Sequence, residues 1–82
     1  MPTYMDIHHM EGGVTAADVA AAHARDVEVQ GAHGVDYKHY WVDEAGGKIF
    51  CLVEAPSAEL AVQVHREAHG LVADQIVEVV EG

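Results

Sequence analysis

The order of hydrophobic patterns along the chain is the feature that most restricts its fold. Four stretches alternate as strands do, which predicts strands over residues 2–10, 35–43, 48–54 and 75–80. Two stretches repeat apolar residues with the helical period, which predicts helices over residues 16–30 and 58–69. This βαββαβ order fills the 82 residues without a linker, so we expect one α+β domain over residues 1–82. Its expected form is ferredoxin-like, an antiparallel sheet with both helices on one face.

Residues with known preferences for helix ends and turns support these boundaries. Thr15 and Ser57 are good N-caps, because a hydroxyl oxygen there accepts a hydrogen bond from the first helical turn. Gly70 is typical of the position just after a helix, where the backbone often turns left-handed. The sequence DEAGG at residues 43–47 predicts a hairpin turn between the second and third strands.

The same periodicity predicts which side chains share a face. In the second predicted strand, Tyr37, His39 and Trp41 are expected to point to one side of the sheet. The buried face of the first predicted helix is expected to contain Ala16, Ala20, His23, Ala24 and Val27. The second predicted helix is expected to bury Leu60, Ala61, Val64 and Ala68.

The sheet face opposite the helices carries bulky side chains that a chain of this length is not expected to cover. A domain of about 80 residues buries little more than about 60% of the surface that its unfolded chain exposes. A second copy of the same chain is the simplest partner that would cover the open face. We therefore expect a homodimer.

Charge and composition exclude several classes of function. Fourteen acidic and four basic residues give a formal net charge of −10, so little positive charge is present to bind nucleic acid. No apolar run approaches the roughly 18 residues of a membrane span, and no signal-peptide pattern opens the sequence. The single cysteine, Cys51, cannot form an internal disulfide, which fits a reducing compartment. We expect a cytoplasmic protein with no nucleic-acid and no membrane partner.

Seven histidines are the outlier in the composition. Neutral imidazole is a common ligand of nickel, copper and zinc ions. His65 and His69 are four residues apart on a predicted helix, so both rings lie on one side and could bind one ion. As an alternative, a histidine in the last helical turn is favoured by the helix dipole alone. The predicted metal ligands are His8, His9, His39, His65 and His69.

Four segments of the chain resemble one family of small bacterial proteins. The sequences MDIHH at residues 5–9, WVDE at 41–44, FCLVEAP at 50–56 and HREAHGLVAD at 65–74 follow one another in the same order there. The family consists of ferredoxin-like domains of unknown function that include a nickel-binding member, and the resemblance covers essentially the whole chain. It implies a dimeric βαββαβ protein that binds Ni²⁺ to sequester or buffer it.

Two other functions stay open on sequence grounds. One is a dimeric α/β-barrel enzyme in which Tyr37, His39 and Trp41 line a cleft for a small organic substrate. The other is a dimerisation module whose histidines have structural roles. A catalytic nucleophile is not expected, because Cys51 is predicted mid-strand as a small hydrophobic residue and Ser57 as a helix cap. We therefore favour a metal-binding protein that is not an enzyme.

Overall fold

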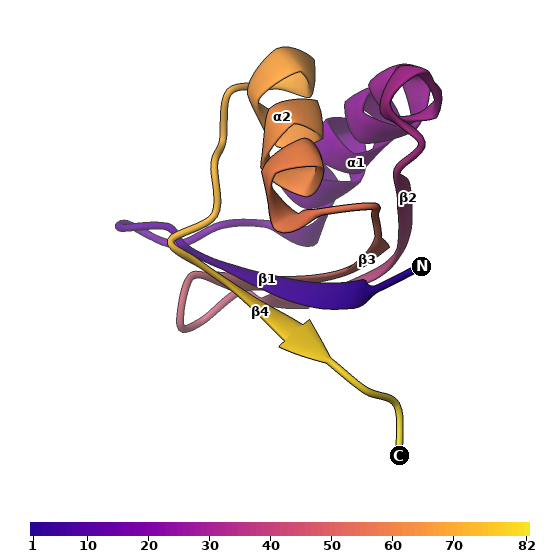
Figure 1. The fold of residues 1–82 in the computed structure, drawn as a ribbon. Coiled ribbons are helices and arrows are strands. Elements are labelled where there is room, and N and C mark those ends of the chain that lie inside the picture. The colour runs from indigo at the N-terminus through magenta and orange to yellow at the C-terminus, as the bar shows by residue number, and fades with distance from the viewer.

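A sheet and a pair of helices form two layers in the computed structural model, which describes all 82 residues (Figure 1). Both helices lie on the same face of the sheet, so the predicted ferredoxin-like fold is confirmed. A short 3₁₀ turn at Gly31–His33 follows the first helix. In chain order the elements are β1 (Thr3–His9), α1 (Ala16–Gln30), β2 (Asp36–Asp43), β3 (Lys48–Glu54), α2 (Ala58–Ala68) and β4 (Gln75–Val79).

The four strands are antiparallel and lie in the order β2-β3-β1-β4. The two central strands, β1 and β3, place Asp6 opposite Cys51, and Ile76 of β4 lies on the other side of Asp6. Side chains directly opposite each other in a sheet point to the same face. This register therefore directs Asp6 and Cys51 together into the space beneath the helices.

A β-bulge in β2 changes the expected faces of that strand. Tyr37 pairs with Val53 and His39 with Leu52, so Lys38 between them has no partner of its own. One extra residue reverses the alternation. Tyr37 consequently points to the helices and is buried, whereas His39 and Trp41 point to the open face. The prediction that Tyr37 shares a face with His39 and Trp41 is wrong for this reason.

The buried face of α1 also differs from the predicted one. Thr15 caps the helix as expected, because its Oγ1 accepts the Asp18 backbone N–H at 3.1 Å. The helix buries Val19 and Asp26, while His23 is half-buried. The residues predicted to be buried but found exposed are Ala16, Ala20, Ala24 and Val27. The prediction followed the alanine stripe and did not allow for a carboxylate in the core.

The apolar core lies between the sheet and the two helices, and α2 contributes to it as predicted. Ala61, Val64 and Ala68 are buried, whereas Leu60, also predicted to be buried, is half-buried against the core. Ser57 caps this helix through the Leu60 N–H. The buried apolar residues are Val19, Val35, Tyr37, Ile49, Cys51, Val53, Ala55, Ala61, Val64 and Ala68. A small group of buried polar residues interrupts this core at its centre.

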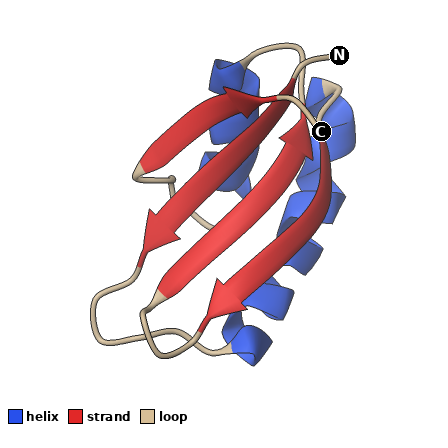
Figure 2. Cartoon of the chain, turned by 90° about the horizontal axis from the view of Figure 1, so that it is seen from below, coloured by secondary structure: helices blue, strands red, loops and turns tan.

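The opposite face of the sheet has no covering layer (Figure 2). Register places alternate residues of each strand there, among them Met5, Phe50 and Val77. Trp41 on this face is 52% exposed. Neither helix is long and apolar enough to cross a membrane.

Candidate metal centre

Two carboxylic acids and two histidines are buried between the sheet and the helices. Asp6 and His8 come from β1, Asp26 from α1 and His65 from α2, and none is more than 4% exposed. An unpaired charge in such a place would be strongly destabilising. Every buried polar side-chain atom nevertheless has a hydrogen-bond partner, so the group forms a complete network.

His65 is the centre of this network. Its Nδ1 lies 2.9 Å from Asp26 Oδ1 and its Nε2 lies 3.0 Å from Asp6 Oδ2. Carboxylate oxygens accept hydrogen bonds, so both ring nitrogens must carry protons and the ring is an imidazolium. Burial by itself would lower the pKa of His65, but the hydrogen bonds and charges of Asp26 and Asp6 outweigh it and raise the pKa to about 9.

Asp6 accepts hydrogen bonds from three donors. His8 Nε2 lies 3.1 Å from Oδ1, and both the Tyr37 hydroxyl, at 2.8 Å, and His65 Nε2 are directed at Oδ2. Burial alone would raise the pKa of this carboxyl group. The hydrogen bonds and positive charge of His65 and His8 prevail and hold the pKa well below its usual range. Asp6 is therefore a carboxylate that orients three side chains at once.

The end of α2 positions His69 against the same network. The helix ends at Ala68, and His69 is its C-cap. Gly70 follows with φ +80°, and the backbone N–H groups of His69 and Gly70 both donate to the His65 carbonyl oxygen. His69 Nε2 then lies 3.1 Å from Asp26 Oδ1. Its Nδ1 accepts the Leu71 N–H at 3.0 Å, so the ring is neutral with its proton on Nε2. Consistent with this tautomer, burial lowers the pKa of His69 below its ordinary value.

A cavity of about 20 Å³ adjoins these side chains. Such a volume is enough for one water molecule or one metal ion. Its polar lining comes from both layers of the protein, with the sheet contributing His8, Tyr40 and Cys51. The helices and the end of α2 contribute His23, Asp26, His65 and His69.

The donor atoms around this cavity fit a divalent transition-metal ion. Two sets of side chains each bring their ligand atoms within 4.8 Å of one another: Asp26, His65 and His69 in one, and Asp6, His8, Cys51 and His65 in the other. Imidazole nitrogen with carboxylate oxygen or thiolate sulfur suits nickel, zinc and copper ions. The hydrogen bond from His65 to Asp6 is also the kind that orients a metal-binding imidazole from behind.

A family model described as "Nickel responsive protein SCO4226-like" matches residues 4–79. The chain belongs to this family. The crystal structure of SCO4226 from Streptomyces coelicolor A3(2) is similar over 98% of both chains, with 39% sequence identity and a TM-score of 0.90. A search of curated proteins finds no match. The resemblance inferred from the four sequence segments is thereby confirmed.

The fold of this nickel-responsive family brings together three of the five histidines predicted as ligands. His8, His65 and His69 line the cavity, and the rings of His8 and His69 lie 5.0 and 4.9 Å from that of His65. His9 and His39 are exposed and lie outside it. The His9 backbone N–H donates to Asp74 Oδ2, and the His39 ring lies 6.2 Å from that of Trp41.

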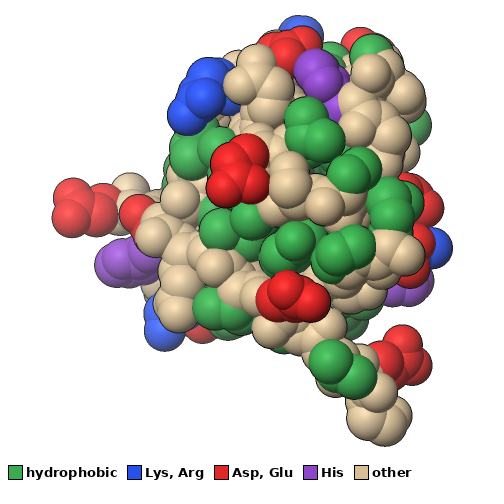
Figure 3. Space-filling model, viewed as in Figure 1, with side chains coloured by type: hydrophobic (Ala, Val, Ile, Leu, Met, Phe, Trp, Pro, Cys, Tyr) green, Lys and Arg blue, Asp and Glu red, His purple; other side chains and the backbone are tan.

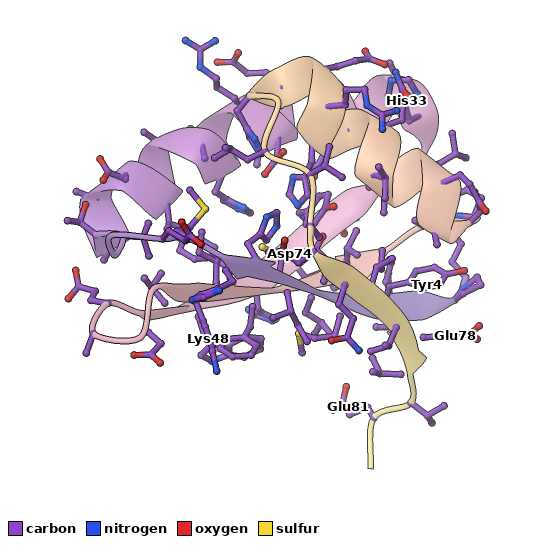
Figure 4. The ribbon with its side chains drawn as sticks, turned by 90° about the vertical axis from the view of Figure 1, so that its left-hand side faces the viewer. Tyr4, His33, Lys48, Asp74, Glu78 and Glu81 are labelled. Carbon is purple, nitrogen blue, oxygen red and sulfur yellow. The ribbon has the colours of Figure 1, made fainter.

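The two remaining histidines have separate environments. The His23 ring lies 4.8 Å from the Tyr40 ring, and Asp26, one turn further along α1, binds His65 and His69. His33 Nε2 lies 3.0 Å from Glu67 Oε2. Figure 4 places His33 on the outer side of the helical layer, far from Lys48, which projects from the opposite side of the sheet.

Sequence reasoning missed Asp26 as a member of the network. It is four residues from Gln30 at the end of α1, on a stripe shared with Val19 and His23, and that spacing is the only local signal. Asp6 was also not predicted as a member of the network. Its role depends on Tyr37, which the bulge in β2 moves to the same side of the sheet.

The enzyme alternative assigned Tyr37, His39 and Trp41 to one cleft, and the bulge separates them. A surface hollow of about 490 Å³ does lie on the open face beside His39 and Trp41. Lys38, Glu54 and Glu81 share its lining with apolar residues, so the hollow is not the deep apolar pocket that a substrate site would favour.

Proposed function

We propose that this protein binds Ni²⁺, or a similar divalent transition-metal ion, and that it sequesters or buffers nickel in the cytoplasm. The observation that supports the proposal best is the convergence of Asp26, His65 and His69 on one wall of an ion-sized cavity. The description of the family as nickel-responsive agrees with it. The net charge of −10 adds a long-range attraction for cations.

Asp26 and His65 are the two ligands that the network prepares best. Asp26 Oδ1 and His65 Nδ1 already face each other, and the other nitrogen of His65 is held by Asp6. An ion bound between them would replace the proton that they share. Asp6 would keep its hydrogen bond to Nε2 and so fix the orientation of the ring.

His69 requires a local change before it can bind through Nε2. That nitrogen carries the proton of the neutral ring, because Nδ1 accepts the Leu71 N–H. Coordination through Nε2 places the proton on Nδ1, where it would face the Leu71 N–H. The turn after α2 must then shift. We therefore expect His69 to contribute less to the affinity than Asp26 or His65.

These ligands do not by themselves select nickel. Copper binds most nitrogen and oxygen sites more tightly than nickel does, so selectivity in the cell would depend on geometry and metal supply. We also propose that the protein acts as a homodimer joined through the open sheet face, where Trp41 and its apolar neighbours are exposed.

Calorimetric titration of the purified protein with Ni²⁺, Zn²⁺, Co²⁺ and Cu²⁺ tests the proposal. Asp26→Asn and His65→Gln should each weaken Ni²⁺ binding about ten- to a hundredfold, the loss of one charge-assisted ligand contact. His69→Ala should weaken it less, and the double variant of His65 and His69 should be only slightly worse than His65→Gln, because ligands of one ion act as a unit.

Three histidines outside the cavity provide matched controls. His9→Ala, His33→Ala and His39→Ala remove the same type of ligand from exposed or half-buried positions and should change the affinity less than about twofold. Far-ultraviolet circular dichroism shows whether each variant is folded. Unchanged affinity in the cavity variants, with a loss in His9→Ala or His39→Ala, would move the site to the open face and contradict the proposal.

A further inference from the structure

We propose that a strap, residues 70–74 between α2 and β4, is the gate of the cavity and that the Leu71 side chain is its plug. This inference rests on the proposed metal-binding function and adds the route by which the ion enters and leaves. The strap has no regular secondary structure. Figure 4 shows it crossing in front of the helices from the end of α2 to Asp74.

Leu71 is the part of the cavity wall that faces the solvent. Eleven residues line the cavity, and Leu71 is the one exposed residue among them, with 40% of its surface accessible. The other ten are buried or half-buried and lie in helices, in strands or, for His69, at the C-cap of α2. Movement of the Leu71 side chain is therefore the smallest change that would connect the cavity with the solvent.

A second hollow, of about 130 Å³, lies next to this wall. It shares four lining residues with the cavity, namely Val19, Ala22, Ile49 and Leu71. The first three are fixed in α1 or β3, so Leu71 is the movable member of the shared wall. The hollow is otherwise lined by exposed or half-buried residues, and one of them, Asp18, places a negative charge where a cation would arrive.

The strap is held firmly at its ends and weakly between them. The backbone N–H groups of Gly70 and Asp74 donate to carbonyl oxygens of α2 and β1, at 2.9 and 3.0 Å. Between these two anchors, residues 71–73 make no backbone–backbone hydrogen bond. Their one hydrogen bond runs from the Leu71 N–H to His69 Nδ1, at 3.0 Å. Segments with so few bonds open locally at a small cost in free energy.

The hydrogen bond between Leu71 and His69 is a latch that the ion itself would release. His69 Nδ1 accepts the Leu71 N–H only while this nitrogen carries no proton. When Nε2 binds the ion, its proton passes to water and Nδ1 takes one up, so the ring stays neutral and the latch is lost. The strap is thus tighter over the empty cavity than over the loaded one.

Stopped-flow mixing of the full chain with Co²⁺, whose visible absorption changes on binding, tests the gate. The observed rate for the wild type should rise with Co²⁺ concentration and then level off at the rate of strap opening. Leu71→Ala should raise this plateau about tenfold, because much of the burial that holds the plug in place is lost. Release of Co²⁺ to an excess of chelator should accelerate too, so the affinity should change far less than either rate.

Val72→Ala is the matched control for this substitution. Val72 lies in the same strap and is also 40% exposed, but it lines neither the cavity nor the hollow beside it. Its truncation should leave both rates close to those of the wild type. A wild-type rate that stays proportional to Co²⁺ concentration, or equal rates in Leu71→Ala and Val72→Ala, would overturn the gate and leave the proposed function standing.

Amide hydrogen exchange of the wild type gives a second measurement that needs no variant. Zn²⁺ should speed exchange of the Leu71 N–H, which loses its acceptor, and should leave the Asp74 N–H, bonded to β1, unchanged. Equal exchange of Leu71 with and without bound Zn²⁺ would overturn the latch and the gate with it. No binding of any of these ions by the wild type would overturn the proposed function and this inference together.

Discussion

His65 is bonded to two carboxylates at once, and this arrangement determines the charge of the core. Asp6 and Asp26 contribute two negative charges and the imidazolium one positive charge, so the network carries a net charge of −1 when His8 and His69 are neutral. Removing the proton from His65 would leave two carboxylates facing a neutral ring in the interior. The stability of the fold should therefore depend on this one proton.

We predict that the protein loses stability as the pH rises from about 6.5 to about 9. The pKa of His65 is about 9 in the folded protein against 6.5 for a fully solvated histidine. A raised folded-state pKa gives stabilisation that is complete below pH 6.5 and disappears as the pH rises through 9. At about 1.4 kcal/mol per pKa unit, the loss is on the order of 3 kcal/mol.

Urea unfolding of the metal-free protein between pH 6 and pH 9 measures this loss. His65→Gln should be less stable than the wild type at pH 6 and should show a flatter profile, because it carries no titrating group at that position. His39→Gln, which changes an exposed histidine, should keep the wild-type profile. Parallel profiles for wild type and His65→Gln would show that the imidazolium does not stabilise the fold.

The same proton should compete with a metal ion. If His65 binds the ion through Nδ1, one proton must leave, so the apparent Ni²⁺ affinity should rise about tenfold per pH unit until the pH reaches about 9. An ordinary exposed histidine would give a plateau above roughly pH 7.5. Calorimetric titrations at pH 7, 8 and 9 distinguish the two cases. A constant affinity over this range would mean that His65 is not a ligand.

Sequence alone could indicate three of the histidines that line the cavity, but not the partners of those histidines. The spacing of His65 and His69 and the density of histidine indicated metal chemistry. The contact between Asp26 and His65 was not predicted, because an isolated carboxylate is normally exposed, and the burial of Asp26 depends on an imidazolium 39 residues away. A contact of that kind leaves no periodic signal in either segment.

At the scale of elements, the ends of helices and strands were more predictable than the side chains that each element buries. The limits of α1 and β3 agree with those predicted from periodicity and capping residues, because these depend on local preferences. The faces of α1 and β2 do not agree. A single bulge between Tyr37 and His39 turns the Tyr37 side chain to the sheet face opposite the predicted one. No residue type in DYKHYW marks where this bulge occurs.

The hairpin between β2 and β3 docks on the end of β1 through a glycine, and this gives a testable prediction. Gly47 has φ +68°, its carbonyl oxygen accepts the Met10 N–H at 2.6 Å, and an added Cβ would overlap the Met10 carbonyl oxygen. Gly47→Ala should lower the unfolding free energy by the left-handed strain, about 1–2 kcal/mol, plus about 1–3 kcal/mol for the overlap.

Gly12→Ala is the matched control for this substitution. Gly12 has φ +85°, but an added Cβ would meet nothing within 4 Å, so only the backbone strain should appear. The difference between the unfolding free energies of the two variants, measured with urea, gives the cost of the overlap between the hairpin and the end of β1. Equal losses for both would show that the hairpin and β1 can separate slightly without cost.

At the scale of the whole molecule, the topology brings distant segments together and leaves one face bare. Asp6 and His65 are 59 residues apart in sequence and meet because β1 is central and α2 crosses above it. Placing both helices on one side, however, exposes the other side of the sheet. Figure 2 looks directly onto this uncovered side, whereas the side view of Figure 3 shows hydrophobic side chains that reach the surface among scattered acidic groups.

We predict that the bare face joins two copies of the chain and that salt strengthens the pairing. Trp41 is 52% exposed there, and register places Met5, Phe50 and Val77 on the same side. Burying these side chains favours association, while two subunits of charge −10 repel each other. Screening reduces that repulsion, so the dimer should dissociate less at about 0.3 M salt than at about 0.02 M.

Sedimentation equilibrium at micromolar concentration measures both the formation of the dimer and its dependence on salt. Trp41→Asp adds a charge to the proposed interface and should give monomers, because the charge would be buried without a partner. Ala17→Asp adds the same charge on the exposed side of α1 and should leave the dimer largely intact. A wild type that sediments only as the 8.8 kDa chain at both salt concentrations would contradict the prediction, since nothing would then cover the open face.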